Sequence, residues 1–349
     1  MKAAVWYKAK DLRVEQAEEP SVKGEHDVKV KVKWCGICGS DLHEYLAGPI
    51  FIPEGSPHPI SGQQAPIIMG HEFAGEVTEV GSKVTKVKAG DRVAIEPILA
   101  PNENGRYTDE KYNLTDLLGF HGLSGGGGGF SEFTVVGEHM VHIIPEELSF
   151  EQGALVEPAA VGLHAVRQSS LKAGDTAAVF GAGPIGLMVI DALKAAGASK
   201  IYAVEVSESR QKKAENLGAV VINASSDDAV KVIQDEIGGV DVAFEVTGIP
   251  KVLNQAVHST HSGGETVIVS IWEGEASLQP NDIVIKERTV KGIIAYRHIY
   301  PAVMELMKQG HFQADMMVTD KIRLDEVVDK GFEVLSTDKS QVKILVSPE

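Results

Sequence analysis

The first 157 residues contain short stretches in which apolar and polar residues alternate, separated by glycine, proline and charged turns. Alternation with a period of two gives a pleated strand one apolar face. We therefore predict strands at 2–6, 28–34, 73–80, 92–96 and 131–136, a pattern typical of a small β-barrel or sandwich. The proline-rich stretch 49–66 and the polar, aperiodic stretch 100–118 are expected to be loops.

From about residue 157 the spacing of the apolar residues changes. Residues 157–169 show helical spacing, and Pro158 would fit the first turn of such a helix, where its missing N–H is not needed. Apolar runs then alternate with helical segments, and we predict strands at 176–180, 201–206, 240–246, 266–271 and 289–294. This order is typical of a doubly wound α/β fold with about six parallel strands.

The chain past Arg297 changes character again, with a predicted helix at 301–309 and a strand at 341–346. We expect this tail to return to the first domain. The chain of 349 residues is long enough for two cores. The expected domains are therefore residues 1–157 completed by 297–349, and residues 158–296.

A glycine-rich turn follows the predicted strand 176–180 at once. It reads Gly181-Ala182-Gly183-Pro184-Ile185-Gly186 and precedes a helix and a second strand. In a unit of about 30 residues with this order, the glycines let the backbone approach a pyrophosphate at the helix N-terminus. Glu205 closes the second strand, where a carboxylate binds ribose hydroxyls and repels a 2′-phosphate. We predict NAD rather than NADP, with Arg210 either packing against the adenine or serving as a surface charge.

A second glycine run, residues 125–129, precedes a predicted strand instead of a helix. A phosphate-binding loop needs the N-terminus of a helix behind it. We therefore interpret this run as a flexible turn.

The run Trp34-Cys35-Gly36-Ile37-Cys38-Gly39-Ser40-Asp41-Leu42-His43 carries the densest set of reactive side chains. Cys38 would lie between a strand and a short helix at 40–46, where the helix dipole favours a thiolate. His71, Glu72 and Glu157 add nitrogen and oxygen donors. Catalytic zinc takes three such protein ligands and leaves one position open. We predict Cys38, His71 and Glu157 as the ligands, with Glu72 as an alternate; Glu157 could instead complement a helix dipole.

Cys35 and Cys38 are the two cysteines of the chain, which excludes a disulfide framework and a structural zinc site with four cysteines. Their C-x-x-C spacing also fits a thiol redox motif. A redox sensor that forms a Cys35–Cys38 disulfide and expels the metal is therefore a hypothesis from a different class. The short helix that follows is unlike the long helix of a thioredoxin-type unit, so we expect Cys35 to be a buried small residue.

The formal net charge of −16 argues against nucleic acid or an anionic membrane surface as the partner. No apolar run approaches the roughly 20 residues of a spanning helix, and the first residues do not resemble a signal peptide. We expect a cytoplasmic protein whose partner is a small molecule.

Taken together, the motifs resemble those of the zinc-containing medium-chain alcohol and polyol dehydrogenases over essentially the whole chain. The stretches that carry the resemblance are GICGSDLH, PIIMGHEFAGEVTEVG, GDRVAIEP, GALVEPAAVGLHAV, VFGAGPIGL and DIVIKERTVKGIIAYR. The resemblance implies a GroES-like catalytic domain, a Rossmann domain, one catalytic Zn²⁺, NAD and a homo-oligomer. It departs at residues 100–118, where the family usually carries four zinc-binding cysteines and this chain has none.

The resemblance also implies roles for single residues. Cys38, His71 and Glu157 match zinc ligands, with Glu72 able to exchange in. The remaining matches are Ser40 and His43 in a proton relay, Asp41 in support of the metal ligands, Arg297 facing the cleft near Glu157, and Pro184, Ile185 and Thr247 at the cofactor.

Within the family, WCGICGSDLHEYLAGPIFIP, ALVEPAAVGLHAVRQS and VSIWEG are similar to enzymes that act on (R,R)-2,3-butanediol and acetoin. The implied reaction is hydride transfer between a vicinal diol or secondary alcohol and NAD, with sorbitol and other polyols as the alternative substrates. A catalytically silent cofactor-binding protein is a third hypothesis. The complete set of Ser40, His43 and metal-ligand positions argues against it.

Overall fold

The computed structural model describes residues 1–272 and 274–349. Within them the chain divides into two compact units, unit 1 with Met1–Glu157 and Tyr300–Glu349, and unit 2 with Pro158–Ile299. Glu273, in the stretch VSIWEG, lies outside the described residues. Unit 1 is thus built from two separate segments of the chain, and unit 2 from one.

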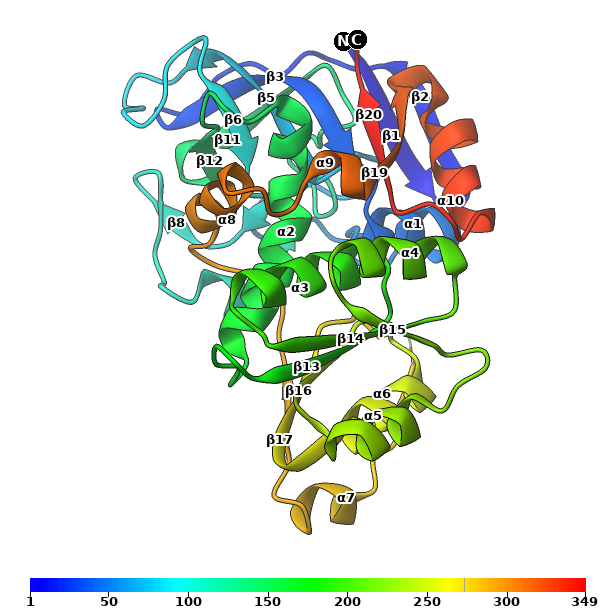
Figure 1. The fold of residues 1–349 in the computed structure, drawn as a ribbon. Coiled ribbons are helices and arrows are strands. Elements are labelled where there is room, and N and C mark those ends of the chain that lie inside the picture. Colours follow the sequence, from blue (N-terminus) through cyan, green and yellow to red (C-terminus); the bar gives the residue numbers. More distant parts are fainter. Residues whose placement is uncertain (273) are drawn as a thin grey trace. The chain divides into compact units, whose positions relative to one another are not determined.

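Unit 1 consists mainly of short strands (Figure 1). They are β1 (Lys2–Lys8), β2 (Asp11–Gln16), β3 (Asp27–Gly36), β4 (Ile67–Ile68), β5 (Glu72–Val80), β6 (Arg92–Ile95), β7 (Ile98–Leu99), β8 (Asn102–Glu103), β9 (Arg106–Tyr107), β10 (Gly119–Phe120), β11 (Phe133–Gly137), β12 (Val141–Ile143), β19 (Val318–Arg323) and β20 (Lys343–Ser347). The largest sheet has the order β12-β6-β5-β3-β20-β19, with β11 paired to β3, and another has the order β2-β1-β4. Val28, Val30 and Val32 of β3 are buried, which is the period of two that the sequence predicts.

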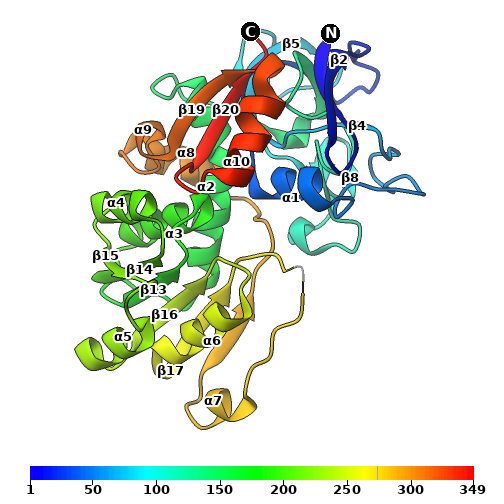
Figure 2. The same cartoon turned by 90° about the vertical axis from the view of Figure 1, so that its right-hand side faces the viewer.

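Besides the first part of α2 (Phe150–Gln168), the helical segments of unit 1 are short. They are α1 (Gly39–Ala47), α8 (Tyr300–Lys308), α9 (Ala314–Met317), α10 (Glu333–Thr337), the 3₁₀ turns η1 (Tyr112–Leu114), η2 (Glu138–Met140) and η3 (Leu324–Glu326), and the π-helical η4 (Val327–Phe332). Strand β20 lies between β19 and β3, parallel to the first and antiparallel to the second, and Figure 2 shows β19 and β20 side by side. The segment after residue 300 therefore supplies two strands to the largest sheet of unit 1.

Helix α2 (Phe150–Gln168) corrects one prediction. Pro158 lies inside this helix and not in its first turn, so the predicted start at residue 157 was wrong. The helix begins earlier because Ser149 and Gln152 cap it reciprocally, each side chain accepting the other's backbone N–H, at 3.1 and 2.9 Å. This S-x-x-Q capping box was readable in the sequence.

The stretch 100–118 was expected to be a loop, and it contains the short strands β8 and β9 and the turn η1. Two aromatic rings anchor it, because Tyr107 and Tyr112 stack with their centroids 3.9 Å apart. The Tyr112 hydroxyl donates to the buried Glu96, whose other carboxylate oxygen pairs with His142. Side-chain packing thus orders a segment that has no cysteine.

Unit 2 contains one six-stranded parallel sheet of order β15-β14-β13-β16-β17-β18. Its strands are β13 (Thr176–Phe180), β14 (Lys200–Glu205), β15 (Val220–Asn223), β16 (Val240–Glu245), β17 (Thr260–Ile268) and β18 (Thr289–Gly292). Its further helices are α3 (Pro184–Ala195), α4 (Glu208–Asn216), α5 (Ala229–Ile237), α6 (Pro250–Ser259) and α7 (Pro280–Val284). Helices α3 and α4 cover one face of the sheet, and α5 and α6 cover the other (Figures 1 and 2). The strand order reverses between β13 and β16, which is where such sheets bind dinucleotides.

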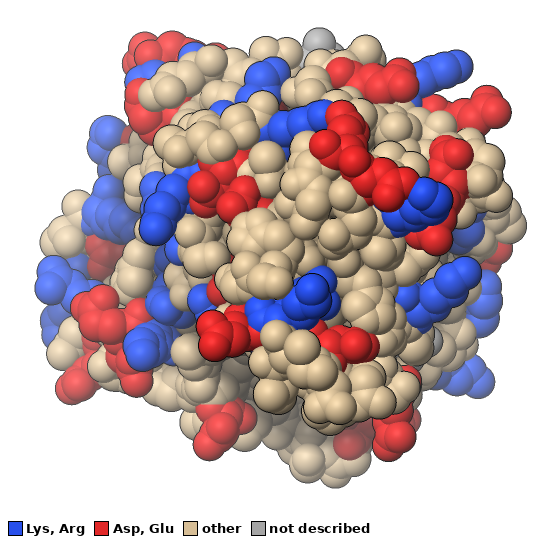
Figure 3. Space-filling view, turned by 60° about the horizontal axis from the view of Figure 1, so that its bottom comes forward, with Lys and Arg blue, Asp and Glu red and all other residues tan. Residues whose placement is uncertain are grey.

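The surface carries both signs of charge. Figure 3 shows Lys and Arg side chains interspersed with Asp and Glu over the face that it displays. Among the described helices, none combines the length and the apolar character that crossing a bilayer requires.

Candidate metal centre and cofactor site

Cys38 lies where the sequence predicts it, between β3 and α1. It is the residue that caps the N-terminus of α1, and the carboxylate of Asp41 in the first turn accepts its backbone N–H at 2.9 Å. The start of α1 and the hydrogen bond to Asp41 therefore fix the backbone that carries this partly buried thiol.

Asp41 also orients His71. Its other carboxylate oxygen lies 3.1 Å from His71 Nδ1, and Asp41 itself is fully buried. An imidazole whose Nδ1–H is bonded to a carboxylate presents Nε2 as the electron-pair donor. Burial would lower the pKa of His71, but the neighbouring charges of Asp41 and Cys38 outweigh it and raise the pKa well above the ordinary value, so a metal ion that binds Nε2 would displace a proton from it.

Cys38, His71 and Glu72 form a cluster whose potential ligand atoms all lie within 4.8 Å of one another. It combines one sulfur, one nitrogen and one oxygen donor. This donor set fits zinc, which binds thiolate, imidazole and carboxylate in its catalytic sites. The structure thus brings together three of the four residues that the sequence predicts as metal ligands.

Glu72 has a partner that the sequence did not suggest. Lys343 on β20 donates from Nζ to both carboxylate oxygens of Glu72, at 2.7 and 2.6 Å, and to the carbonyl oxygen of Ile37 at 3.0 Å. Burial would lower the pKa of Lys343, but the negative charges of Glu72 and Cys38 raise it. This buried ammonium is therefore retained as a charge beside the cluster.

Glu157, the predicted third ligand, is also in unit 1 and is 6 % exposed. It lies on α2 and is close enough to Lys343 to contribute to its electrostatic environment. It is not part of the cluster formed by Cys38, His71 and Glu72. The choice between Glu72 and Glu157 as the oxygen ligand stays a prediction.

Ser40 and His43 lie on one face of α1, because they are three residues apart on a helix. Ser40 Oγ is 3.3 Å from His71 Nε2, beside the cluster. His43 is exposed. The role of Ser40 and His43 as a proton relay stays a prediction.

Arg297, predicted to act near Glu157, belongs to unit 2. There it contributes to the electrostatic environment of His164 on α2. Burial, with Arg297 and Arg167 as nearby positive charges, lowers the pKa of His164 to about 4. His164 is therefore a neutral packing residue, and the catalytic role of Arg297 stays a prediction.

The glycine-rich turn of unit 2 leads from β13 into α3, and Gly183 caps the helix. Gly181 has φ +97°, and a Cβ built on Gly186 would lie 1.9 Å from the Gly181 carbonyl oxygen, so neither position accommodates a side chain. Pro184 and Ile185 then form the first turn of α3. The turn that leads into the N-terminus of α3 therefore exposes backbone without side chains at its glycines, which is the arrangement that binds a pyrophosphate.

Glu205 ends β14 beside this turn. Its carboxylate accepts backbone N–H groups from Ala182, Val206 and Ser207, at 2.8, 2.8 and 2.9 Å. It therefore also fixes the glycine-rich turn. Arg210 Nη1 is 3.7 Å from a Cβ built on Gly183, so the guanidinium lies against the same turn.

Sequence reasoning missed Glu245 at the end of β16. This fully buried carboxylate accepts the N–H of Thr247 at 2.6 Å, its hydroxyl at 2.5 Å and the N–H of Gly248 at 3.0 Å. A Cβ on Gly181 would lie 2.7 Å from Thr247 Cγ2, so Thr247 packs against the glycine-rich turn. The sequence does contain a pattern that could have indicated this residue, because Glu245 is a charged residue at the end of a mostly apolar strand.

Cys35 is fully buried in the core of unit 1. Burial, with help from Asp41 and Glu72, raises its pKa well above the ordinary value. Thiol–disulfide exchange needs a thiolate. The position of Cys35 therefore gives the redox-sensor hypothesis no support.

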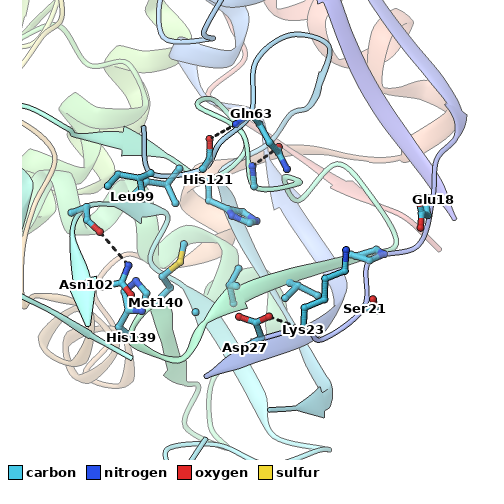
Figure 4. A pocket seen from close by; sticks show the side chains of 18 of the residues that line it. Glu18, Ser21, Lys23, Asp27, Gln63, Leu99, Asn102, His121, His139 and Met140 are labelled. Atoms are coloured by element: carbon cyan, nitrogen blue, oxygen red, sulfur yellow. Dashed lines mark hydrogen bonds between the residues drawn. The ribbon is translucent and has the colours of Figure 1, made fainter. Parts of the chain in front are cut away.

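Unit 1 also contains a pocket of about 690 Å³ whose lining includes none of the cluster residues (Figure 4). Several of its labelled polar side chains bond to nearby backbone. Asp27 accepts the N–H of Lys23 at 3.1 Å, and Gln63 accepts that of Gly126 at 2.8 Å. These side chains hold the loops around the pocket.

Comparison with known proteins defines the class. Residues 24–146 match the model of the alcohol dehydrogenase GroES-like domain, and residues 184–309 match that of the zinc-binding dehydrogenases. The chain belongs to the zinc-binding alcohol dehydrogenase family and is an oxidoreductase of the two-domain fold predicted from its sequence, which is thereby confirmed.

Particular relatives extend over the whole chain. An (R,R)-butanediol dehydrogenase of Bacillus subtilis strain 168 is 62 % identical over 350 residues, covering 100 % of both chains. The crystal structure of 2R,3R-butanediol dehydrogenase from Bacillus subtilis superposes with a TM-score of 0.95 at 62 % identity, covering 100 % of this chain and 99 % of the other. A sorbitol dehydrogenase of Bacillus subtilis is 34 % identical over 354 residues, covering 100 % and 97 %.

Proposed function

We propose that this protein is a zinc- and NAD-dependent dehydrogenase that interconverts a vicinal diol and its hydroxyketone, with (R,R)-2,3-butanediol and acetoin as the pair. The observation that carries the proposal is the 62 % identity, over the full length of both chains, to a relative with that activity in its name. Sorbitol has weaker support, because the sorbitol dehydrogenase relative is 34 % identical.

Cys38 and His71 hold the zinc, with Glu157 as the third ligand and Glu72 able to exchange in. When bound, zinc supplies a Lewis acid that makes an alcohol hydroxyl acidic enough to lose its proton near neutrality. Asp41 keeps His71 in the tautomer that donates from Nε2. Ser40 would accept the alcohol proton while its own hydroxyl proton passes on through the cofactor ribose to the exposed His43, which releases a proton to solvent.

The unit 2 residues bind and orient NAD. The turn Gly181–Gly186 receives the pyrophosphate, and Glu205 binds the adenosine ribose while it also fixes that turn. Thr247 contacts the cofactor from the next loop, and Arg210 packs against the adenine. The negative charge of Glu205 supports NAD over NADP, because a 2′-phosphate would meet a like charge.

We further propose one zinc per chain, a homo-oligomer and a cytoplasmic location. Two cysteines are too few for a second site with four thiolates. Both thiols are free, and a thiolate that serves as a metal ligand suits a reducing compartment.

The test compares kcat/KM for NAD-linked oxidation of (R,R)-2,3-butanediol and of sorbitol by one zinc-replete preparation. We expect a preference of about a hundredfold for butanediol, about 2.7 kcal/mol in transition-state binding. A preference for sorbitol would refute the proposal that (R,R)-2,3-butanediol is the substrate. Cys38→Ser should lose zinc and turnover but keep NADH binding, and wild-type turnover by the zinc-free variant would refute the metal's role.

A further inference from the structure

Lys343 is an unusual residue for the position that it occupies. It lies on β20, in the largest sheet of unit 1, and is 1 % exposed. A buried ammonium is strongly unfavourable unless it is paired and its three N–H donors are satisfied. Here Glu72 and the carbonyl of Ile37 supply three acceptors, so the geometry of the group is fully determined.

The acceptors of Lys343 lie on the two segments that carry the predicted metal ligands. Ile37 immediately precedes Cys38, and Glu72 immediately follows His71. The backbone reinforces this connection, because the N–H of Ile37 donates to the carbonyl of Ile344 at 3.0 Å. Strand β20 thus connects both ligand-bearing segments.

The backbone leaves room for the Glu72 carboxylate in this arrangement. Glu72 is fully buried, and a Cβ built on Gly36 would lie 2.2 Å from Glu72 Oε2. The carboxylate therefore occupies space that a side chain at position 36 would fill. It contacts the Lys343 ammonium, and it lies within 4.8 Å of the potential ligand atoms of Cys38 and His71, so a metal ion held by those two residues would be within its reach.

We propose that Lys343 is a positioning residue that holds Glu72 back from the zinc, so that the metal position needed by the substrate stays open. The inference rests on the proposed function. Both Glu72 oxygens are engaged by the ammonium, so the carboxylate can bind the metal only by giving up part of that ion pair. Without Lys343, the metal is the cation left to neutralise this buried carboxylate, and Glu72 becomes a permanent ligand.

The test replaces Lys343 in the full-length, metal-loaded protein. Lys343→Met removes the ammonium but keeps an unbranched apolar chain, and Lys343→Gln replaces the ammonium with a neutral amide that can still donate a hydrogen bond to Ile37. We measure the rate at which a chelator removes zinc, the visible absorption of the Co²⁺-substituted protein, and kcat. We expect zinc release to slow about tenfold or more, the Co²⁺ bands to weaken as a ligand is added, and kcat to fall.

Two further variants separate this role from a general effect on packing. Lys343→Met combined with Glu72→Gln removes both charges and should return zinc release and the Co²⁺ spectrum towards wild type. Lys321→Met, on the adjacent strand β19, breaks an exposed ion pair with Glu151 and should leave every measurement unchanged.

Zinc release that is unchanged or faster in both folded single variants would overturn the inference. So would failure of the double variant to restore the wild-type rate. The proposed function fails separately, and first, if the wild-type protein binds no zinc or does not oxidise (R,R)-2,3-butanediol.

Discussion

Acid should destabilise this protein partly through His121, a residue outside the metal cluster. His121 is 2 % exposed, and its Nε2 contacts the carbonyl oxygen of Gly127 at 2.9 Å and Thr134 Oγ1 at 2.7 Å. A Cβ on Gly126 would lie 2.2 Å from its Nδ1, so the glycine run 125–129 folds closely over the ring. Burial lowers the pKa of His121 from 6.5 to about 4, although the Gly127 carbonyl partly opposes the shift.

The direction of the stability change with pH follows from comparing proton uptake by His121 in the folded and unfolded states. The unfolded chain protonates this histidine below about pH 6.5, and the folded protein does so only below about pH 4. Its contribution to stability is therefore complete above about pH 6.5 and is lost as the pH falls towards 4. A shift of about 2.5 units at about 1.4 kcal/mol per unit corresponds to about 3.5 kcal/mol, of which about 2 should disappear between pH 7 and 4.5.

The assay is urea unfolding at several pH values, with wild type compared with His121→Gln. The variant cannot take up this proton, so its unfolding free energy should fall less steeply with acid by about 2 kcal/mol. His261 is a control of opposite sign, because its hydrogen bond to Asp241 raises its pKa. Its contribution is complete below the unfolded pKa and is lost as the pH rises through the folded pKa. Parallel pH curves for wild type and His121→Gln would refute the reasoning.

Two other substitutions test the structure directly. Gly186→Ala places a Cβ 1.9 Å from the Gly181 carbonyl oxygen, so NADH affinity, measured by fluorescence titration, should fall at least about tenfold, whereas Gly292→Ala, with open space around it, should not change it. Tyr112→Phe removes a hydrogen bond to the buried Glu96 and should cost about 1–3 kcal/mol in thermal unfolding, and an unchanged melting temperature would contradict the anchoring role of this ring.

The features that the sequence predicted well are local ones. A strand, a glycine-rich turn, a helix and a second strand follow one another within β13–β14, and the alternation in β3 is directly readable. The fold class could therefore be inferred from short windows. The start of α2 was not predicted, although the capping pair of Ser149 and Gln152 is also local, because a proline such as Pro158 is typical of the first turn of a helix.

The features that the sequence did not predict depend on distant contacts. Lys343 and Glu72 are 271 residues apart, and no local pattern connects them. The sequence could not decide between Glu72 and Glu157 as the oxygen ligand for a related reason. Neighbouring residues of a strand face opposite sides, so the direction of the Glu72 side chain depends on the register between β5 and β3.

The interrupted chain path of unit 1 has a consequence for protein synthesis. Unit 2 is one continuous segment, whereas β19 and β20 of unit 1 follow it in the chain. During translation the residues of unit 2 are all present before Lys343 is made, and domains fold as their residues become available. The surroundings of Cys38 and His71 are therefore incomplete until Lys343 has been synthesised. The nascent chain should acquire its nucleotide-binding sheet first and its finished metal centre last.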